Sequence, residues 1–312
     1  MALKQSDIDI CLVNDKPNKK FLFIVSSILR KNNYENIITL SHTRIPLIKL
    51  FDPEYNINID LCLNNLLAIE NSKLIKSYSS IDPRFQVLYM LIKAWAKAKE
   101  INDAADESLS SYSYANLVIF YLQTCTPPVL PCLHKNTESL PKRTVENSVV
   151  AFHQDPKALG FVTKNTLTVG ELFYDFLCFY STFDFKRYAI CINKGHMVEL
   201  KNCQKELLVA PACIYIQDPF IFDFNPGKSM TEKNFTKLLT EINKTIYIIS
   251  NGIKDYGFDQ IFSEPSLLSL SSNVKQHNLT LILDNNDGAM DNNNNIDNSN
   301  INNNEKLDKK KN

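Results

Sequence analysis

The sequence predicts an α+β fold, in which a small sheet with helices precedes a mostly helical region. Along the first eighty residues, apolar and polar side chains alternate in short segments, which is the period-two pattern of half-buried strands. After Asp82 and Pro83, apolar residues recur at helical spacing to about residue 250. The chain has 312 residues, 44% of them hydrophobic, and therefore suffices for roughly two domains of about 150 residues each.

The alternation also locates the individual strands of the first eighty residues. The predicted strands cover residues 6–13, 37–40, 45–51 and 56–63, and a helix is predicted over residues 17–30. In the first strand, Asp7 and Asp9 lie on one face and the aliphatic side chains lie on the other. In the last strand, Asp60 lies on the polar face in the same way. Three carboxylates are therefore predicted on strands of one sheet.

The helical region begins at Asp82, a predicted N-cap, with Pro83 at the first helical position. Apolar stripes predict helices around residues 85–96, 117–122 and 170–180, separated by a long surface loop over residues 127–165. From Asn285 onward, 12 of 28 residues are Asn, a composition that is typical of a disordered tail.

The composition excludes several classes of protein. The formal net charge of +0 argues against nucleic-acid binding through overall charge and leaves room only for a local basic site. No apolar run approaches the roughly 20 residues that span a bilayer, so no membrane partner is expected. The eight cysteines form no CxxC pair and lie in apolar or strand-like segments, which favours buried, reduced thiols over a disulfide framework or a zinc site. The first residues resemble no targeting sequence, which leads us to expect the cytoplasm, or the nucleus, as the location.

Three aspartates on neighbouring strands repel one another unless a cation lies between them. Oxygen ligands of this kind select Mg²⁺ or Mn²⁺, and a two-metal site stabilises both oxygens of a phosphoryl transfer. The alternative for Asp7, Asp9 and Asp60 is a solvated edge strand, since a D-x-D pattern on a strand is common.

Several motifs in a fixed order extend this hypothesis. They are SDIDI at residues 6–10, RIPLIK at 44–49, NIDLCLNN at 58–65, KAWAK at 93–97, LSSYSY at 109–114 and IQDPF at 216–220. Together they resemble the noncanonical poly(A) polymerase and terminal uridylyltransferase family, which belongs to the DNA polymerase beta-like nucleotidyltransferase superfamily and carries a PAP-associated domain. The resemblance covers about residues 3–250.

The resemblance implies a domain order. Residues 1–80 would form the nucleotidyltransferase catalytic domain, a mixed sheet with helices. Residues 81–260 would form the helical central domain, with the PAP-associated nucleotide-recognition segment at about 168–228. Residues 261–312 would be a C-terminal extension. The superfamily places a Gly-Ser pair, which grips the triphosphate, about ten residues before the first catalytic aspartate, and we expect the catalytic domain to be N-terminally incomplete because Met1 to Ser6 do not contain it.

The implied function is a template-independent RNA 3′-terminal nucleotidyltransferase that adds AMP or UMP from an NTP. Asp7, Asp9 and Asp60 would be the catalytic residues and metal ligands, with Asp60 assisting deprotonation of the RNA 3′-hydroxyl. Asn65 would bind the ribose 2′-hydroxyl and Ser72 would lie beside the sugar and base. The alternative for Asn65 is a turn residue that follows the strand.

The triphosphate and base positions also follow from the resemblance. Lys93 and Lys97 lie at i and i+4 of one helix and match the ligands of the β- and γ-phosphates, although an isolated pair would suit a hydrated helix edge equally well. Ser111 matches another phosphate ligand. Tyr112 matches the ring on which the base stacks, a contact worth about 1–3 kcal/mol.

The identity of the base depends on Asp218 and the residues after it. UTP-preferring members usually carry a His six residues after this Asp, and Phe224 stands there in this chain. Because the histidine donor to uracil is missing, the sequence favours ATP over UTP as the nucleotide partner. The alternative is that Phe224 is an unrelated packing residue.

Two other functions remain open at this stage. The absent Gly-Ser segment motivates a catalytically impaired or inactive family member that acts as a binding or scaffold protein. A nucleotidyltransferase for a small-molecule or protein acceptor is the third reading. An RNA 3′ end is the expected substrate, and since no RNA-recognition motif occurs, an adaptor protein is expected to supply RNA choice.

Overall fold

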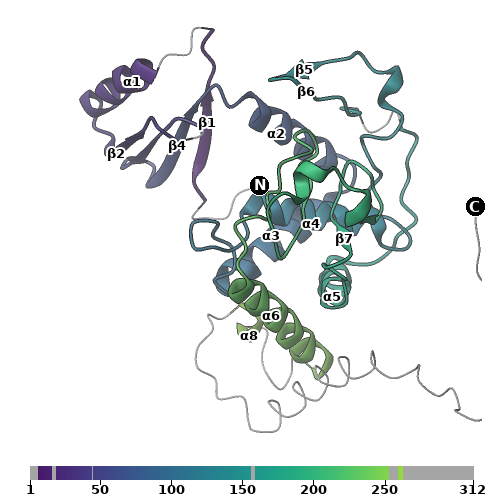
Figure 1. The fold of residues 1–312 in the computed structure, drawn as a ribbon. Coiled ribbons are helices and arrows are strands. Elements are labelled where there is room, and N and C mark those ends of the chain that lie inside the picture. The colour runs from purple at the N-terminus through teal and green to yellow at the C-terminus, as the bar shows by residue number, and fades with distance from the viewer. Residues whose placement is uncertain (1–5, 16–18, 44, 156–158, 253–258, 263–312) are drawn as a thin grey trace, which may run out of the picture. The chain divides into compact units, whose positions relative to one another are not determined.

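The computed structural model describes residues 6–15, 19–43, 45–155, 159–252 and 259–262. The expectations for the first five residues and for the Asn-rich segment lie outside these residues. Figure 1 shows the arrangement of the helices and strands.

A mixed four-stranded sheet contains the predicted strands. Its order is β1-β4-β3-β2, with bounds Ile8–Leu12, Ile57–Leu63, Leu47–Asp52 and Glu35–Leu40. β1 runs parallel to β4, and the other two pairings are antiparallel. Helix α1 (Lys19–Lys31) lies against one face of the sheet, where its Leu22 and the sheet residue Ile48 are fully buried. The opposite face carries the aspartates.

β1 is the edge strand of this sheet, and its aliphatic residues are less buried than the alternation predicts. Ile8 is 44% exposed and Ile10 is 40% exposed, although both lie on the side of the sheet that α1 covers further along. An edge strand has a neighbour on one side only, which explains this difference. The alternation itself, and hence the placement of Asp9 on the other face, agrees with the prediction.

Five longer helices follow the sheet along the chain. They are α2 (Leu66–Ser79), α3 (Pro83–Ala98), α4 (Ser111–Thr124), α5 (Val169–Ser181) and α6 (Glu232–Ser250). The predicted N-cap of α3 is confirmed, because the Asp82 side chain accepts a hydrogen bond of 2.9 Å from the backbone N–H of Arg84. The shorter elements are β5 (Thr144–Val145), β6 (Ser148–Val149), β7 (Tyr188–Ala189), β8 (Val198–Glu199) and α8 (Asp259–Phe262).

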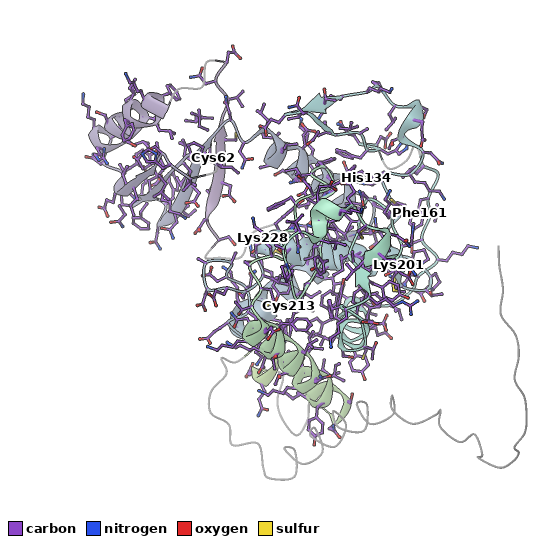
Figure 2. All side chains as sticks on the ribbon, in the orientation of Figure 1. Cys62, His134, Phe161, Lys201, Cys213 and Lys228 are labelled. Carbon is purple, nitrogen blue, oxygen red and sulfur yellow. The ribbon has the colours of Figure 1, made fainter. Side chains whose placement is uncertain are left out.

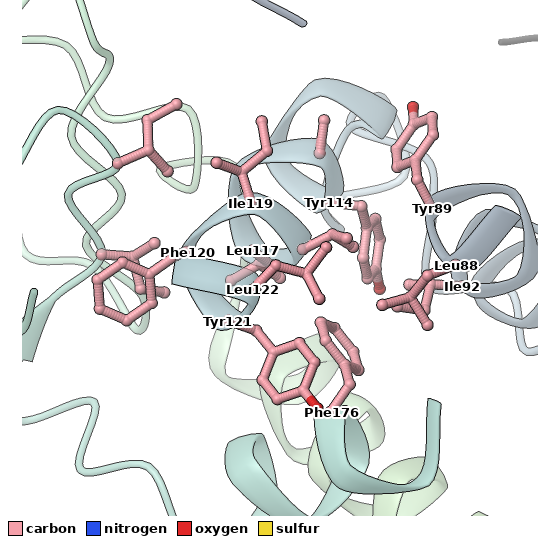
Figure 3. Packing of buried hydrophobic residues seen from close by; sticks show 14 of the residues in the cluster. Leu88, Tyr89, Ile92, Tyr114, Leu117, Ile119, Phe120, Tyr121, Leu122 and Phe176 are labelled. Carbon is pink, nitrogen blue, oxygen red and sulfur yellow. The ribbon is translucent and has the colours of Figure 1, made fainter. Parts of the chain in front are cut away.

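Helix α4 lies at the centre of the helical core. Every side chain from Ser113 to Gln123 is buried, and its apolar residues pack against Leu88 and Ile92 of α3 and Phe176 of α5 (Figure 3). A helix that is apolar all round is one enclosed by its neighbours. The start of α4, which carries predicted phosphate and base ligands, is therefore held in a rigid position.

Some sequence expectations are wrong. The residues between α5 and α6 are all described, and they form short strands, turns and 3₁₀ segments instead of continuing the helical pattern. α2 was not predicted, because residues 66–79 show only a weak apolar periodicity. The eight cysteines are free, as expected, but only Cys191 is buried. Among the described residues, no helix combines the length and the apolar character that a membrane span requires.

Candidate active site

Asp9 and Asp60 lie directly opposite each other in the sheet. They are register partners in the adjacent parallel strands β1 and β4, and Asp7 lies just before β1 on the same side as Asp9. The predicted placement of the aspartates on neighbouring strands is therefore correct. Partial burial, and then the charges of Asp60 and Asp7, raise the pKa of Asp9 above its usual range. The three carboxylates are thus close enough to repel one another.

A lysine on the third strand partly compensates for this negative charge. Lys49 on β3 is the register partner of Asp60, and its Nζ lies 2.8 Å from Oδ2 of Asp60. The hydrogen bond to Asp60 and the charges of Asp60, Asp7 and Asp9 raise the pKa of Lys49 against the opposing effect of burial. The Asp60 carboxylate is therefore turned toward a protein cation.

The three aspartates have the right chemistry for metal ligands, but their side chains are not arranged around one point. Within the described residues, no three His, Cys, Asp or Glu side chains converge on one point. The assignment of Asp7, Asp9 and Asp60 as metal ligands stays a prediction, and in this structure the Asp60 carboxylate is paired with Lys49. The donors still fit Mg²⁺ or Mn²⁺, because all are carboxylate oxygens, and after burial the charges of Asp60 and Asp7 also raise the pKa of Asp9.

The two predicted phosphate-binding lysines lie on α3 beside this cluster. Lys93 is buried, and its Nζ lies 3.3 Å from Oγ of Ser6, the residue before Asp7. Burial and the neighbouring Lys97 ammonium lower the pKa of Lys93, while the charges of Asp9 and Asp7 act in the opposite direction. Lys97 is exposed one turn further along. The structure therefore brings the two lysines and the β1 aspartates together.

Ser111 is linked by a hydrogen bond to α3, the helix that carries the two lysines. It is the first residue of α4, its carbonyl oxygen accepts a 3.1 Å hydrogen bond from the Tyr89 hydroxyl, and Tyr89 lies one turn before Lys93 on α3. Its own hydroxyl donates to Oδ1 of Asn102 at 3.2 Å. A helix N-terminus adds free N–H groups and a favourable dipole for an anion. Ser111, at the start of α4, is thus tied to α3, the helix that carries Lys93 and Lys97.

Tyr112 and Asp218 are linked by a direct hydrogen bond. The Tyr112 hydroxyl donates to Oδ2 of Asp218 at 2.9 Å, and Oδ1 of Asp218 accepts from the backbone N–H groups of Phe220 and Ile221, each at 2.9 Å. Burial raises the pKa of Asp218 against the effect of these donors, and burial followed by the Asp218 charge raises that of Tyr112. Because the carboxylate is engaged within the protein, Asp218 positions the Tyr112 ring and the following loop.

The residues at the start of α2 have distinct local roles. Asn65 occupies the N-cap position but makes no capping hydrogen bond with its side chain, which instead lies beside the Cys62 thiol. The turn itself is fixed by Asn64, whose side chain exchanges two 2.7 Å hydrogen bonds with the backbone of Asn14. Ser72 is exposed, and its hydroxyl donates to the Ala68 carbonyl at 2.9 Å.

Phe224 lies in the loop that Asp218 organises. Its carbonyl oxygen accepts a hydrogen bond of 3.1 Å from the backbone N–H of Asp218, and its ring is partly exposed. The Lys228 ammonium, which Figure 2 labels, lies 5.1 Å from the ring centroid, a cation–π distance. The loop therefore presents an aromatic face and a positive charge at the position predicted to select the base.

Sequence reasoning missed Lys49 and Asn71. The Asn71 side chain contributes to the surroundings of Asp218, and its Oδ1 is buried without a hydrogen-bond partner among the described residues. Asn71 precedes the predicted nucleotide ligand Ser72, but without α2 in the prediction its direction was unknown. Lys49 could have been found from the sequence, because alternation within residues 45–51 places it on the polar face of its strand.

Two family models match this chain. That of the central palm domain of mitochondrial-like poly(A) RNA polymerases matches residues 1–80, and that of Cid1 family poly A polymerases matches residues 168–224. Terminal uridylyltransferase 7 of Homo sapiens is 33% identical over 247 residues, which are 74% of this chain and 16% of that protein. Poly(A) RNA polymerase cid13 of Schizosaccharomyces pombe is 28% identical over 276 residues, which are 87% of this chain and 48% of that protein.

The fold is similar to solved structures of the Cid1 poly(U) polymerase. One of them matches with a TM-score of 0.74 and 26% identity, over 84% of this chain and 82% of that chain. The Cid1 structures include one with its short product ApU and one with Mg and 3′-dATP. The sheet, the helices and their arrangement thus define a nucleotidyltransferase fold. The chain belongs to the noncanonical poly(A) polymerase and terminal uridylyltransferase family. The match spans about one sixth of the length of terminal uridylyltransferase 7 and about half of that of cid13.

Proposed function

We propose that this chain carries the catalytic core of an enzyme that adds nucleotides from an NTP to RNA 3′ ends without a template. The observation that carries the proposal is the pair of register partners Asp9 and Asp60, which we call the Asp9–Asp60 rung, with the buried Lys93 beside it. Family membership supports the same reaction, because relatives of this chain are named as poly(A) polymerases and terminal uridylyltransferases. Residues 1–80 are proposed as the catalytic domain and 81–260 as the helical central domain.

Mg²⁺ or Mn²⁺ held by Asp7, Asp9 and Asp60 would neutralise charge on the attacking and leaving oxygens. Asp60 would accept the proton of the RNA 3′-hydroxyl once its carboxylate turns away from Lys49. Two ammonium groups, those of Lys93 and Lys97, would balance the charge of the β- and γ-phosphates.

The other side chains would bind and orient the nucleotide. The N-terminus of α4 would add phosphate contacts through Ser111. The base would stack on Tyr112, whose hydroxyl is fixed by Asp218. The amide groups of Asn65 and Asn71 would hydrogen-bond to the hydroxyls of the sugar. Phe224, in place of a histidine donor, supports a preference for ATP over UTP.

The test is primer extension by the purified chain with a labelled oligoribonucleotide, Mg²⁺ and each NTP separately. We expect extension that is lost in Asp9→Asn and Asp60→Asn and kept in Asp15→Asn, which alters an exposed carboxylate outside the rung. Calorimetry with ATP and Mg²⁺ separates the alternatives. Binding without extension would indicate a nucleotide-binding scaffold, and the absence of both would refute the proposal. Extension of a small-molecule or protein acceptor but not of RNA would change the substrate class.

A further inference from the structure

Two thiols lie on the same face of the sheet as the aspartates. Cys11 of β1 and Cys62 of β4 are register partners, two positions along from the pair Asp9 and Asp60. Because side chains alternate along a strand, all four side chains point to the same side. Figure 2 labels Cys62 within the sheet. On this face of the sheet, the thiol pair is therefore the next pair of register partners after Asp9 and Asp60, where cation binding is proposed.

The two thiols lie side by side, and solvent can reach both residues. Both cysteines are free and neither is fully buried. The Cys11 thiol is a hydrogen-bond partner of Cys62, and the Cys62 thiol donates to the Ile10 carbonyl across the strands at 3.4 Å. The side chain of Asn65 lies on the other side of the Cys62 sulfur. The local packing thus holds the thiols together beside a proposed nucleotide contact.

We propose that Cys11 and Cys62 form a reversible disulfide that modifies the carboxylate face of the sheet. The oxidant is a small disulfide such as oxidised glutathione. Each cysteine loses its thiol hydrogen, one sulfur–sulfur bond forms between the two residues, and the small disulfide gains two electrons and two protons as it is cleaved into two thiols. Atoms and electrons balance in this exchange, which proceeds through a mixed disulfide.

The bond would disturb the adjacent rung. Neighbouring strands lie about 4.8 Å apart, a Cα separation that a disulfide can span, but its Cβ atoms lie roughly 3.8 Å apart, so the two strands must turn these Cβ atoms toward each other. Asp9 and Asp60 follow this movement because they are two residues away on the same strands. Asn65 also loses its thiol neighbour. A disulfide under such strain is readily reduced, as expected of a regulatory bond. The effect on cation binding rests on the proposed function, whereas formation of the bond does not.

The chain offers a matched control in a second pair of neighbouring thiols. Cys191 and Cys203 also share a hydrogen bond, but Cys191 is only 1% exposed, and both residues lie outside the sheet. An oxidant therefore reaches the Cys11 and Cys62 pair more easily than the Cys191 and Cys203 pair.

The experiment treats the reduced chain with oxidised glutathione and maps disulfides by mass spectrometry of peptides kept under non-reducing conditions. We expect a Cys11–Cys62 link that dithiothreitol reverses and that is absent in Cys62→Ser but present in Cys203→Ser. Binding of Mn²⁺, followed by electron paramagnetic resonance, should weaken by at least about tenfold on oxidation and recover on reduction, as for other losses of support around a metal site. Cys62→Ser should bind Mn²⁺ equally well before and after oxidant.

Each other outcome has a distinct meaning. No Cys11–Cys62 link, or a preferred link between Cys191 and Cys203, overturns the modification site. A link that leaves Mn²⁺ binding unchanged overturns its effect on the carboxylates. A link that weakens Mn²⁺ binding in a chain that never extends RNA supports the modification site and refutes the proposed function instead.

Discussion

Nζ of Lys49 lies 2.8 Å from Oδ2 of Asp60, and the two residues are register partners on β3 and β4. The lysine therefore neutralises part of the negative charge that Asp60 shares with Asp9 and Asp7. Because the Lys49 side chain is 49% exposed, solvent screens the pair and its contribution to stability is small. The pair is thus weak enough for a divalent cation to displace.

Replacement of Lys49 should make the chain more responsive to Mg²⁺. In Lys49→Met, Asp60 is released and the carboxylates repel one another more strongly, so the metal-free chain should lose less than about 1 kcal/mol of unfolding free energy. Addition of Mg²⁺ should then raise the melting temperature more than in the unmodified chain, as thermal unfolding would show. Lys237→Met, which removes the exposed partner of Glu100, is the control. Equal Mg²⁺ shifts in all three proteins would contradict this role of Lys49.

The raised pKa of Asp9 predicts how the effect of Asp9→Asn on the unfolding free energy depends on pH. Relative to the ordinary value of 3.8, a raised pKa means that the folded chain holds the proton more tightly than the unfolded chain. The associated stabilisation is complete below pH 3.8 and is lost as the pH rises through the raised pKa. At pH 7 without metal, Asp9→Asn should therefore be more stable than the unmodified chain, by less than about 1 kcal/mol because solvent screens these charges.

Urea unfolding in EDTA at pH 7, 5.5 and 4 would measure this dependence. The advantage of Asp9→Asn should shrink toward the lowest pH, and Asp15→Asn should show no comparable trend. A gain that is constant across the three pH values would contradict the repulsion among Asp7, Asp9 and Asp60.

Much of the sheet could be predicted because apolar and polar residues alternate along its strands. Burial of one face fixes the alternation in residues 56–63, and hence the side on which Asp60 lies. The direction and the edge position of β1 could not be predicted, because nothing local to residues 6–13 indicates that this strand runs parallel to β4 or lies at the edge. The contact between Tyr112 and Asp218 joins residues 106 apart in sequence, and it depends on a loop without regular structure. The resemblance to a family, not periodicity, identified both residues.

Exchange of Phe224 tests the preference for the base. Phe224→His introduces a hydrogen-bond donor beside Lys228, and should raise the ratio of kcat/KM for UTP to that for ATP by about tenfold, since one discriminating hydrogen bond is worth roughly 1–1.5 kcal/mol. Phe222→His, an exposed exchange in the same loop, is the control. If neither variant changes the ratio, Phe224 is a packing residue and does not select the base.

The hydroxyl and the ring of Tyr112 can be tested separately. Tyr112→Phe keeps the ring but removes a donor from the buried Asp218, so it should cost about 1–3 kcal/mol of unfolding free energy with little change in nucleotide binding. Tyr112→Ala also removes the stacking surface and should weaken NTP binding by a further 1–3 kcal/mol, about 5- to 150-fold, in calorimetry. Tyr174→Phe is the control, because the hydroxyl of Tyr174 bonds to the exposed side chain of Ser250 and not to a buried carboxylate. Equal NTP affinity in the Phe and Ala variants would show that the base does not stack on Tyr112.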